Sequence, residues 1–210
     1  MSATAADRAY DHVKHAILDG SYAGGALLTE GEVADAVGVS RTPVREAMLR
    51  LQVEGMLRLY PKKGAMVVPV TAAEAEAVLE ARTLVESWAA PQAASRGAQL
   101  ADELEPYLTQ MRDHRASGYV TGFSEADRTF HERIVAAAGN DILTRLYRSL
   151  RERQICISEA VMRLSEERMD IALDDHSQLV DRLRAGDEAG FVELTERHLQ
   201  QAIDNTRSSR

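Results

Sequence analysis

Apolar residues recur at helical spacing along most of this 210-residue chain. In the first quarter of the sequence this pattern predicts three helices, at about residues 6–19, 30–37 and 42–54. A glycine follows each of them, at Gly20, Gly38 and Gly55, where a helix can end in a left-handed conformation. We therefore expect a compact arrangement of three short helices at the start of the chain.

The helical period gives way to two short runs of β-prone residues at 56–60 and 65–70. Pro61-Lys62-Lys63-Gly64 separates them, so the pattern predicts a hairpin with a basic tip. Three helices followed by such a hairpin are typical of a winged helix-turn-helix, whose third helix enters the major groove of DNA. We predict this fold for residues 1–70.

The third predicted helix has a basic start. Thr42 is the predicted N-cap and Pro43 the first helical residue, because proline has no backbone donor to lose there. Arg41 and Arg45 lie at or beside this start. Proteins that bind the major groove present cationic side chains and free backbone N–H groups in this way. These arginines are therefore candidates for DNA contact, the alternative being two ordinary solvated side chains.

The chain from residue 71 onward is helical in period, with no stretch that alternates as a strand does. Thr71 and Glu74 predict a capping box at its start, and Pro91 should kink or break the first helix. The predicted helices cover residues 72–96, 101–116, 123–138, 141–164, 167–185 and 188–206. The fold class is thus mostly α, with an all-α antiparallel helical bundle over residues 71–210.

Four polar residues occupy the apolar stripes of this predicted bundle: Asp127, His131, His176 and His198. A buried carboxylate needs compensation, and three imidazoles with one carboxylate suit a divalent metal. Zinc is the favoured ion, with nickel, manganese or iron as alternatives. Hydrogen-bonded core histidines are the simpler explanation of each residue alone. A hydrolytic centre has no additional acid or base to support it, so no catalytic residue is assigned.

Charge and cysteine content add two constraints. The net charge is −8, yet the first 70 residues carry eight basic and eight acidic side chains, so the acidic excess lies in the predicted bundle. The segment from Arg41 to Lys63 contains six basic and two acidic residues. This local positive charge is typical of an acidic protein with one nucleic-acid-binding patch. With Cys156 as the single cysteine, no signal-like segment and only short apolar runs, we expect a cytoplasmic protein without a membrane span.

The sequence EVADAVGVSRTPVREAMLRLQVEG at residues 32–55 resembles the helix-turn-helix of the GntR family of bacterial transcriptional regulators, and the similarity continues through Gly64. The resemblance implies a double-stranded DNA operator as the partner. It places DNA contacts, by position, at Ser40, Arg41, Thr42, Arg45, Lys63 and Gly64. It also implies a homodimer that binds an inverted repeat, since one short helix covers only a half-site.

The second part of the chain resembles the FCD ligand-binding domain of the FadR-like GntR subgroup. The similar segments are Asp127-Arg-Thr-Phe-His131, Ala138-Gly-Asn140-Asp, Asp175-His176-Ser-Gln-Leu-Val, Ala185-Gly-Asp187 and Arg197-His198-Leu199. This resemblance implies a metal held by Asp127, His131, His176 and His198, with a small organic acid bound near it. Arg82 is a candidate clamp for the effector carboxylate, or else the partner of Glu86 in a surface ion pair. Asn140 is a second effector-binding candidate, or else a helix cap.

Together these patterns predict a ligand-responsive transcriptional regulator, expected to be a repressor and not an enzyme. Two alternatives remain at this point. One is a metal-dependent enzyme of small carboxylates fused to a DNA-binding module, and the other is a regulator for which the metal itself is the signal.

Overall fold

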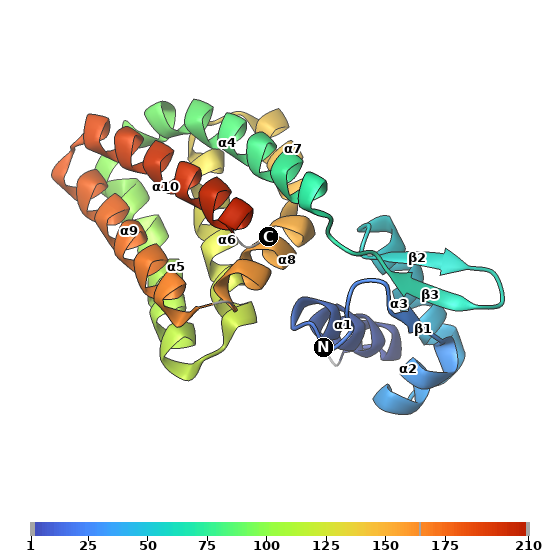
Figure 1. The fold of residues 1–210 in the computed structure, drawn as a ribbon. Coiled ribbons are helices and arrows are strands. Elements are labelled where there is room, and N and C mark those ends of the chain that lie inside the picture. The colour runs from blue at the N-terminus through green and yellow to red at the C-terminus, as the bar shows by residue number, and fades with distance from the viewer. Residues whose placement is uncertain (1–2, 164, 209–210) are drawn as a thin grey trace. The chain divides into compact units, whose positions relative to one another are not determined.

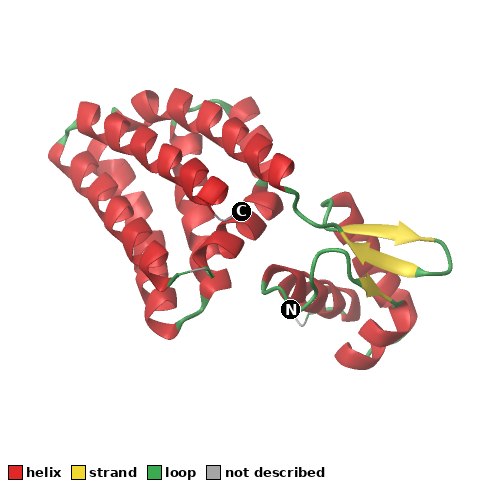
Figure 2. Cartoon of the chain, in the orientation of Figure 1, coloured by secondary structure: helices red, strands yellow, loops and turns green. Residues whose placement is uncertain are grey.

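The computed structural model describes residues 3–163 and 165–208. The chain divides into two compact units, Met1–Val70 and Thr71–Arg210, and each is described here by itself. The first unit combines helices with a small sheet, and the second is entirely helical over its described residues (Figures 1 and 2). The predicted fold class is therefore confirmed.

The first unit contains helices α1 (Ala5–Leu18), α2 (Glu30–Val37) and α3 (Arg41–Val53). The predicted Thr42 cap is wrong, because Ser40 is the N-cap, in the extended conformation, and α3 begins at Arg41, two residues before the predicted first helical residue Pro43. Thr42 and Pro43 consequently lie inside the first turn. Proline is tolerated there because the first backbone N–H groups of a helix have no internal partner to lose.

The sheet of the first unit has three short strands in the order β1-β3-β2, all antiparallel. The predicted hairpin is formed by β2 (Leu57–Tyr60) and β3 (Gly64–Val67). The strand β1 (Leu27–Leu28) was not predicted, since two residues are too few to show alternation. Gly64 has a φ of 102°, and a Cβ there would lie 2.2 Å from the carbonyl oxygen of Leu28. The wing tip therefore requires glycine at this position.

The described residues of the second unit form seven helices. They are α4 (Ala72–Ala94), α5 (Gly97–Ser117), α6 (Val120–Ala137), α7 (Asp141–Ser149), α8 (Arg151–Met162), α9 (Glu166–Ala185) and α10 (Glu188–Ser208). Half of the predicted capping box is present: the Thr71 hydroxyl accepts from the backbone N–H of Glu74 at 3.1 Å. The Glu74 carboxylate does not return a bond to the cap residue and pairs with Arg153 at 2.9 Å. Pro91 lies inside α4 and does not end it.

The single helix predicted at 141–164 is wrong. The chain forms α7 and α8, separated at Leu150, which serves as the C-cap of one helix and the N-cap of the other. Neither glycine nor proline marks this break, so the helical period alone could not locate it. The predicted end at residue 164 lies outside the described residues.

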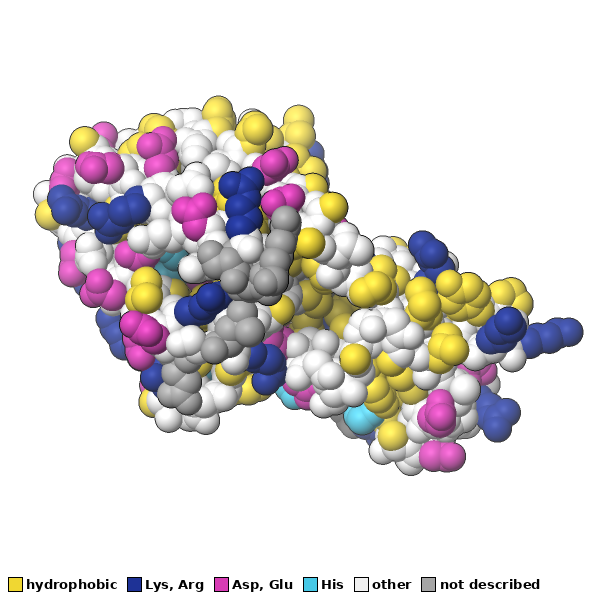
Figure 3. All heavy atoms as spheres, viewed as in Figure 1, with side chains coloured by type: hydrophobic (Ala, Val, Ile, Leu, Met, Phe, Trp, Pro, Cys, Tyr) yellow, Lys and Arg dark blue, Asp and Glu magenta, His cyan; other side chains and the backbone are white. Residues whose placement is uncertain are grey.

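The core of the second unit lies at two sets of helix contacts. In one, α5 packs against both α6 and α9; in the other, α10 packs against α4. Leu104, Phe130, Ile134, Leu179 and Phe191 are among its fully buried side chains. The described helices include none that is long and apolar enough to cross a membrane. Acidic and basic side chains are interspersed over the face of this unit seen in Figure 3, whereas basic side chains stand out from the end of the β2–β3 hairpin in the first unit.

Candidate functional site

The four predicted ligands meet inside the helical unit. Asp127 and His131 come from α6, His176 from α9 and His198 from α10, and each is at most 8% exposed. One ligand atom from each residue lies within 4.8 Å of the other three. His131 and His198 stack with ring centroids 5.1 Å apart. The structure thus brings together all four residues that the sequence singled out.

Each imidazole has an acceptor oxygen close to its Nδ1 atom. Nδ1 of His131 lies 2.7 Å from Glu86 Oε2, Nδ1 of His176 lies 2.5 Å from the carbonyl oxygen of Ala172, and Nδ1 of His198 lies 3.0 Å from Asp175 Oδ2. All three of these partners are acceptors, so Nδ1 carries the proton and Nε2 keeps its lone pair. This arrangement is how proteins fix the tautomer and the ring orientation of metal-binding histidines.

The free nitrogen atoms then face one another. Nε2 of His131 and Nε2 of His176 lie 3.1 Å apart, and Asp127 Oδ1 lies 3.2 Å from the latter. Three electron-rich atoms at this distance repel one another unless a cation lies between them. One divalent ion would compensate the whole set. With metal–ligand bonds of about 2.0–2.2 Å, neighbouring ligand atoms lie roughly 3.0–3.5 Å apart. Two of the separations fall in this range, whereas His131 Nε2 and Asp127 Oδ1 are 3.8 Å apart and the four ligand atoms lie within 4.8 Å of one another, so the side chains would have to move slightly closer around an ion.

Glu86 is the main supporting residue that sequence analysis did not assign to the site. Its fully buried carboxylate accepts hydrogen bonds from Arg82 Nε at 2.6 Å and from the Tyr147 hydroxyl at 2.7 Å. Burial alone would raise the pKa of Glu86, but the charge of Arg82, the His131 imidazole and the Tyr147 hydroxyl outweigh it and hold that pKa well below its usual range. The ion pair with Arg82 was anticipated, but as a surface contact, and that placement is wrong.

Burial sets the protonation of His131 and His198. It lowers the pKa of His131 to about 4, with the positive charge of Arg82 acting in the same direction and Glu86 opposing it. Burial also lowers the pKa of His198. For Asp127, burial would raise the pKa, but the neighbouring His176, His131 and Arg82 outweigh it and lower the pKa. At neutral pH His131 and His198 are therefore neutral and Asp127 is ionised, which are the forms that bind a metal.

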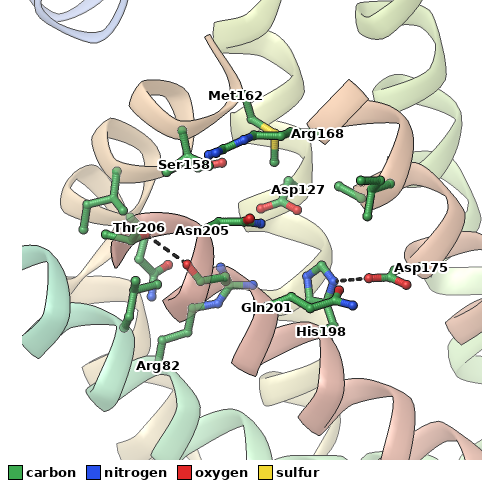
Figure 4. Close-up of a pocket in the computed structure, with 17 residues that line it drawn as sticks. Arg82, Asp127, Ser158, Met162, Arg168, Asp175, His198, Gln201, Asn205 and Thr206 are labelled. Carbon is green, nitrogen blue, oxygen red and sulfur yellow. Dashed lines mark hydrogen bonds and ion pairs between the residues drawn. The ribbon is translucent and has the colours of Figure 1, made fainter. Parts of the chain in front are cut away.

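A cavity of about 70 Å³ adjoins the cluster. Asp127, His198 and Arg82 line it, so a molecule in this cavity would touch both the cluster and the predicted carboxylate clamp (Figure 4). Asn140 is not among the lining residues. Its side-chain oxygen instead accepts from two backbone N–H groups at the start of α7, each at 3.1 Å. The helix-cap alternative therefore describes Asn140.

The predicted DNA contacts lie in the first unit. Ser40, Arg41, Thr42, Arg45 and Lys63 are exposed, and Gly64 is partly buried at the wing tip. A concave surface between α3 and the hairpin brings together Arg41, Arg45, Lys63 and Gly64, with Lys62 and Gln52 beside them. Ser40 and Thr42 do not line it. Arg45 Nε lies 3.9 Å from Glu30 Oε1, a loose contact at an exposed site that leaves the guanidinium available to DNA.

Comparisons with known proteins agree with this architecture. Residues 5–67 match the family described as bacterial regulatory proteins, gntR family, and residues 77–201 match the FCD domain. The chain is 30% identical to the "Probable D-xylose utilization operon transcriptional repressor" of Paenarthrobacter nicotinovorans, over 88% of this chain and 80% of that protein. It is 27% identical to the gluconate operon transcriptional repressor of Bacillus subtilis, over 90% and 79% of the two chains.

Solved structures show the same fold. A transcriptional regulator GntR from Rhodococcus sp. RHA1 superposes with a TM-score of 0.78 over 98% of both chains, at 23% identity. McbR/YncC of Escherichia coli superposes with a TM-score of 0.76 over 99% of both chains, at 22% identity. The chain belongs to the GntR family of bacterial transcriptional regulators, with an FCD domain after its winged helix-turn-helix.

Proposed function

We propose that this regulator is a repressor that binds an inverted-repeat operator as a homodimer, and that a small organic acid controls it by binding beside a divalent metal in the FCD domain. The enzyme alternative is set aside, because the family and the named relatives are transcriptional regulators. Since an operator-binding protein acts on the chromosome, we place it in the cytoplasm.

The observation that carries the metal proposal is the set of lone pairs that face one another at the cluster. His131, His176 and Asp127 bring three electron-rich atoms to within 3.8 Å of one another, so a small movement of the side chains would place all three around one metal ion. Zinc is our first choice, with nickel, manganese or iron as alternatives. The metal would supply a fixed positive charge and an open coordination position for an oxygen ligand of the effector.

The cavity beside the cluster supports an acidic effector. Arg82 lines it with a guanidinium whose Nε is held by Glu86, so its remaining N–H groups keep a fixed orientation. A guanidinium and a metal on the same cavity form a suitable site for a carboxylate. Relatives named for the gluconate operon and, in Escherichia coli, the galactonate operon are consistent with an acid as the signal.

The DNA side of the proposal rests on the exposed surface between α3 and the wing. Arg41 is our candidate for a bidentate contact to guanine, and Arg45 can serve a base or a phosphate. Lys63 at the wing tip would contact the backbone. Two copies related by a twofold axis would place two such surfaces on an inverted repeat. An acid that binds one conformation better than another would then shift operator affinity.

Metal analysis and thermal unfolding test this proposal. We expect about one divalent ion per chain after reconstitution, and a rise in melting temperature when an organic acid is added to the metal-loaded protein. The screen would include sugar acids, hydroxy acids and dicarboxylates, each with metal and with chelator. Protein that takes up no metal and unfolds identically in chelator would overturn the metal site. If metal alone altered operator binding and no acid did, the metal itself would be the signal.

A further inference from the structure

Helix α4 has a second apolar face, which the described residues of the chain leave exposed. Its buried side chains, such as Val85 and Ala89, pack into the helical unit. Ala77, Leu84 and Trp88 lie on the outer side, and the exposed fraction is 75% for Leu84 and 40% for Trp88, the single tryptophan of the chain. Because monomeric proteins rarely expose a contiguous apolar patch without a use for it, this face indicates a contact surface.

The same face lacks charge. Between Glu80 and Arg96 the chain has only two charged residues, Arg82 and Glu86, and both are buried. Charged residues make up 28% of the whole chain, so an outer helix face with none of them over residues 81–95 differs from an ordinary solvated surface. Depletion of charge and the presence of an aromatic residue are typical of the core of a protein–protein interface.

The neighbouring helix α7 widens this face. Tyr147 of α7 packs with Val85 and Ala89 of α4, whereas Ile142 and Leu146 remain 70% and 50% exposed. Figure 3 shows hydrophobic side chains along the upper edge of the helical unit, where α4 and α7 run in Figure 1. Two adjacent helices therefore present apolar side chains at one edge of the unit.

The apolar residues on the outer side of α4 form one seam. Ala77, Ala81, Leu84, Trp88 and Pro91 are separated by four, three, four and three residues. An average step of about 3.5 residues keeps a seam facing a second helix along its length, so that the side chains of each helix pack between those of the other. The occupant that this spacing predicts is a helix.

The order of small and large residues along the seam identifies that helix. The seam is small at Ala77 and Ala81 and large at Leu84 and Trp88. A second copy of α4 that runs in the opposite direction places Trp88 on Ala77 and Leu84 on Ala81, about a twofold axis near residues 82–83. A parallel copy would instead place large on large and small on small, which overfills some layers and leaves cavities in others. The seam is thus complementary to itself in the antiparallel direction, as an isologous contact requires.

The charges at the border of the face fit the same arrangement. Glu80 on α4 and Arg145 on α7 are exposed, and neither has an ion pair within the described part of the chain. In the antiparallel arrangement Glu80 of one copy lies level with Val85 of the other copy, beside which that copy's α7 packs. Opposite charges therefore meet at the rim, where they favour the correct orientation of the two copies more than they add affinity.

We propose that the outer face of α4, together with Ile142 and Leu146 of α7, is the contact between the two helical units of the homodimer, and that the two α4 helices pack antiparallel. This inference rests on the homodimer of the proposed function and names the surface that forms it. It gives Trp88 a role, since Ala77 of the second copy covers its indole ring.

The mass of the full-length, metal-loaded protein tests this surface. By sedimentation velocity at micromolar concentration we expect the wild type to have twice the 23.1 kDa mass of one chain. Leu84→Glu would bury an unpaired carboxylate against the second copy, so its dimer dissociation constant should rise at least about 100-fold. The fluorescence emission of Trp88 should shift to longer wavelength as the dimer dissociates, because water then reaches the indole.

Val53→Glu is the matched control. Val53 is 89% exposed in the first unit, so this variant adds the same charge at a more exposed apolar position and should remain a dimer. Circular dichroism and metal content show whether the variants are folded and loaded. If Leu84→Glu fails to fold, Leu84→Ala serves instead and should weaken the dimer about tenfold, since it removes only apolar contact.

Disulfide cross-linking in a Cys156→Ser background tests the antiparallel order. A mixture of Ala81→Cys and Leu84→Cys proteins should form a linked dimer after subunit exchange and oxidation, because these two positions lie opposite each other. Each variant alone should form clearly less. Linking of Leu84→Cys to itself without the mixed product would indicate parallel helices and would overturn the arrangement.

The possible failures are distinguishable. A folded Leu84→Glu variant that remains a dimer of unchanged affinity would overturn this surface while leaving the homodimer of the proposed function intact. A wild type that is monomeric without DNA would also overturn this surface, and the number of chains bound per operator then decides the proposed homodimer separately.

Discussion

The two functional regions of this protein differ in how their side chains are held. Arg41 and Arg45 in the first unit are exposed and make at most one loose ion pair. The cluster of Asp127 and the three histidines is buried, and each imidazole has a fixed acceptor behind it. A surface that must search DNA can leave its cations solvated, whereas a metal site must be organised before the ion arrives. Substitutions should therefore separate function from stability in the first region and couple them in the second.

The largest effect is expected from His176→Ala. Its Nε2 lies at the centre of the cluster, so the variant should lose the metal, with content falling from about one ion per chain to near zero. Metal at about 1,000 times its dissociation constant stabilises the native state by roughly 4 kcal/mol, or about 10 °C in melting temperature for a unit of this size. The variant should gain none of this on adding metal. His12→Ala, at an exposed position, is the control, and a variant that still binds one ion would contradict the assigned ligand set.

A smaller effect is expected from Glu86→Gln. This change keeps the shape of the side chain but removes the charge that orients His131 and holds Arg82. Metal affinity, measured by competition with a chelator, should fall about 10–100-fold. Glu80→Gln on the exposed face of α4 should have no effect. Equal metal affinity in both variants would show that the contact behind His131 does not tune the site.

In the DNA-binding region, Arg41→Ala should lower operator affinity by about 1–3 kcal/mol at fixed salt. The melting temperature should not change, because the side chain is exposed and has no hydrogen bond or ion pair among the described residues. Arg8→Ala, exposed on α1, is the control. Operator duplex selected from a random pool provides the probe. If Arg41→Ala lowered the melting temperature but not the operator affinity, the expected difference between the DNA-binding region and the buried cluster would be contradicted.

The smallest effect on the free energy of unfolding is expected at a surface ion pair. There the contribution of charge can be measured with little contribution from burial. Burial alone would raise the pKa of Glu103, but hydrogen bonding to Arg133 and the charge of Arg96 outweigh burial and lower this pKa. A lowered native-state pKa stabilises the fold above the unfolded-state pKa, near 4.5, and this stabilisation is lost as the pH falls below it. Glu103→Gln should cost under about 1 kcal/mol at pH 7, and this cost should shrink as the pH falls from the unfolded-state pKa through the lowered native-state pKa, measured by urea unfolding. A larger cost at pH 7, or one that grows as the pH falls, would contradict this assignment.

Sequence patterns predicted the elements of the fold wherever a helix was long or ended at a glycine. The stop at Gly38 and the apolar stripes that carry His131, His176 and His198 are local features, so periodicity located them. The break at Leu150 and the two-residue strand β1 depend on tertiary packing, which leaves no periodic signal. The Ser40 cap was missed because Thr42 and Pro43 suit a helix start equally well.

The sequence predicted the four candidate metal ligands but not the residues that hydrogen bond to or pair with them. A histidine on an apolar stripe stands out in a sequence, whereas Glu86 resembles any acid one turn from an arginine. Its burial against His131 and Tyr147 follows only from how α4, α6 and α7 pack.

The most direct test of the account is an operator titration with metal-loaded protein, with and without an acid that raises its melting temperature. Fluorescence anisotropy at fixed salt would give the two dissociation constants. We predict that the acid changes operator affinity about 5–150-fold, and that this change disappears after chelation and in His176→Ala. An unchanged operator affinity in the metal-loaded protein, or an equal change after the metal is removed, would contradict a metal-supported effector site that controls DNA binding.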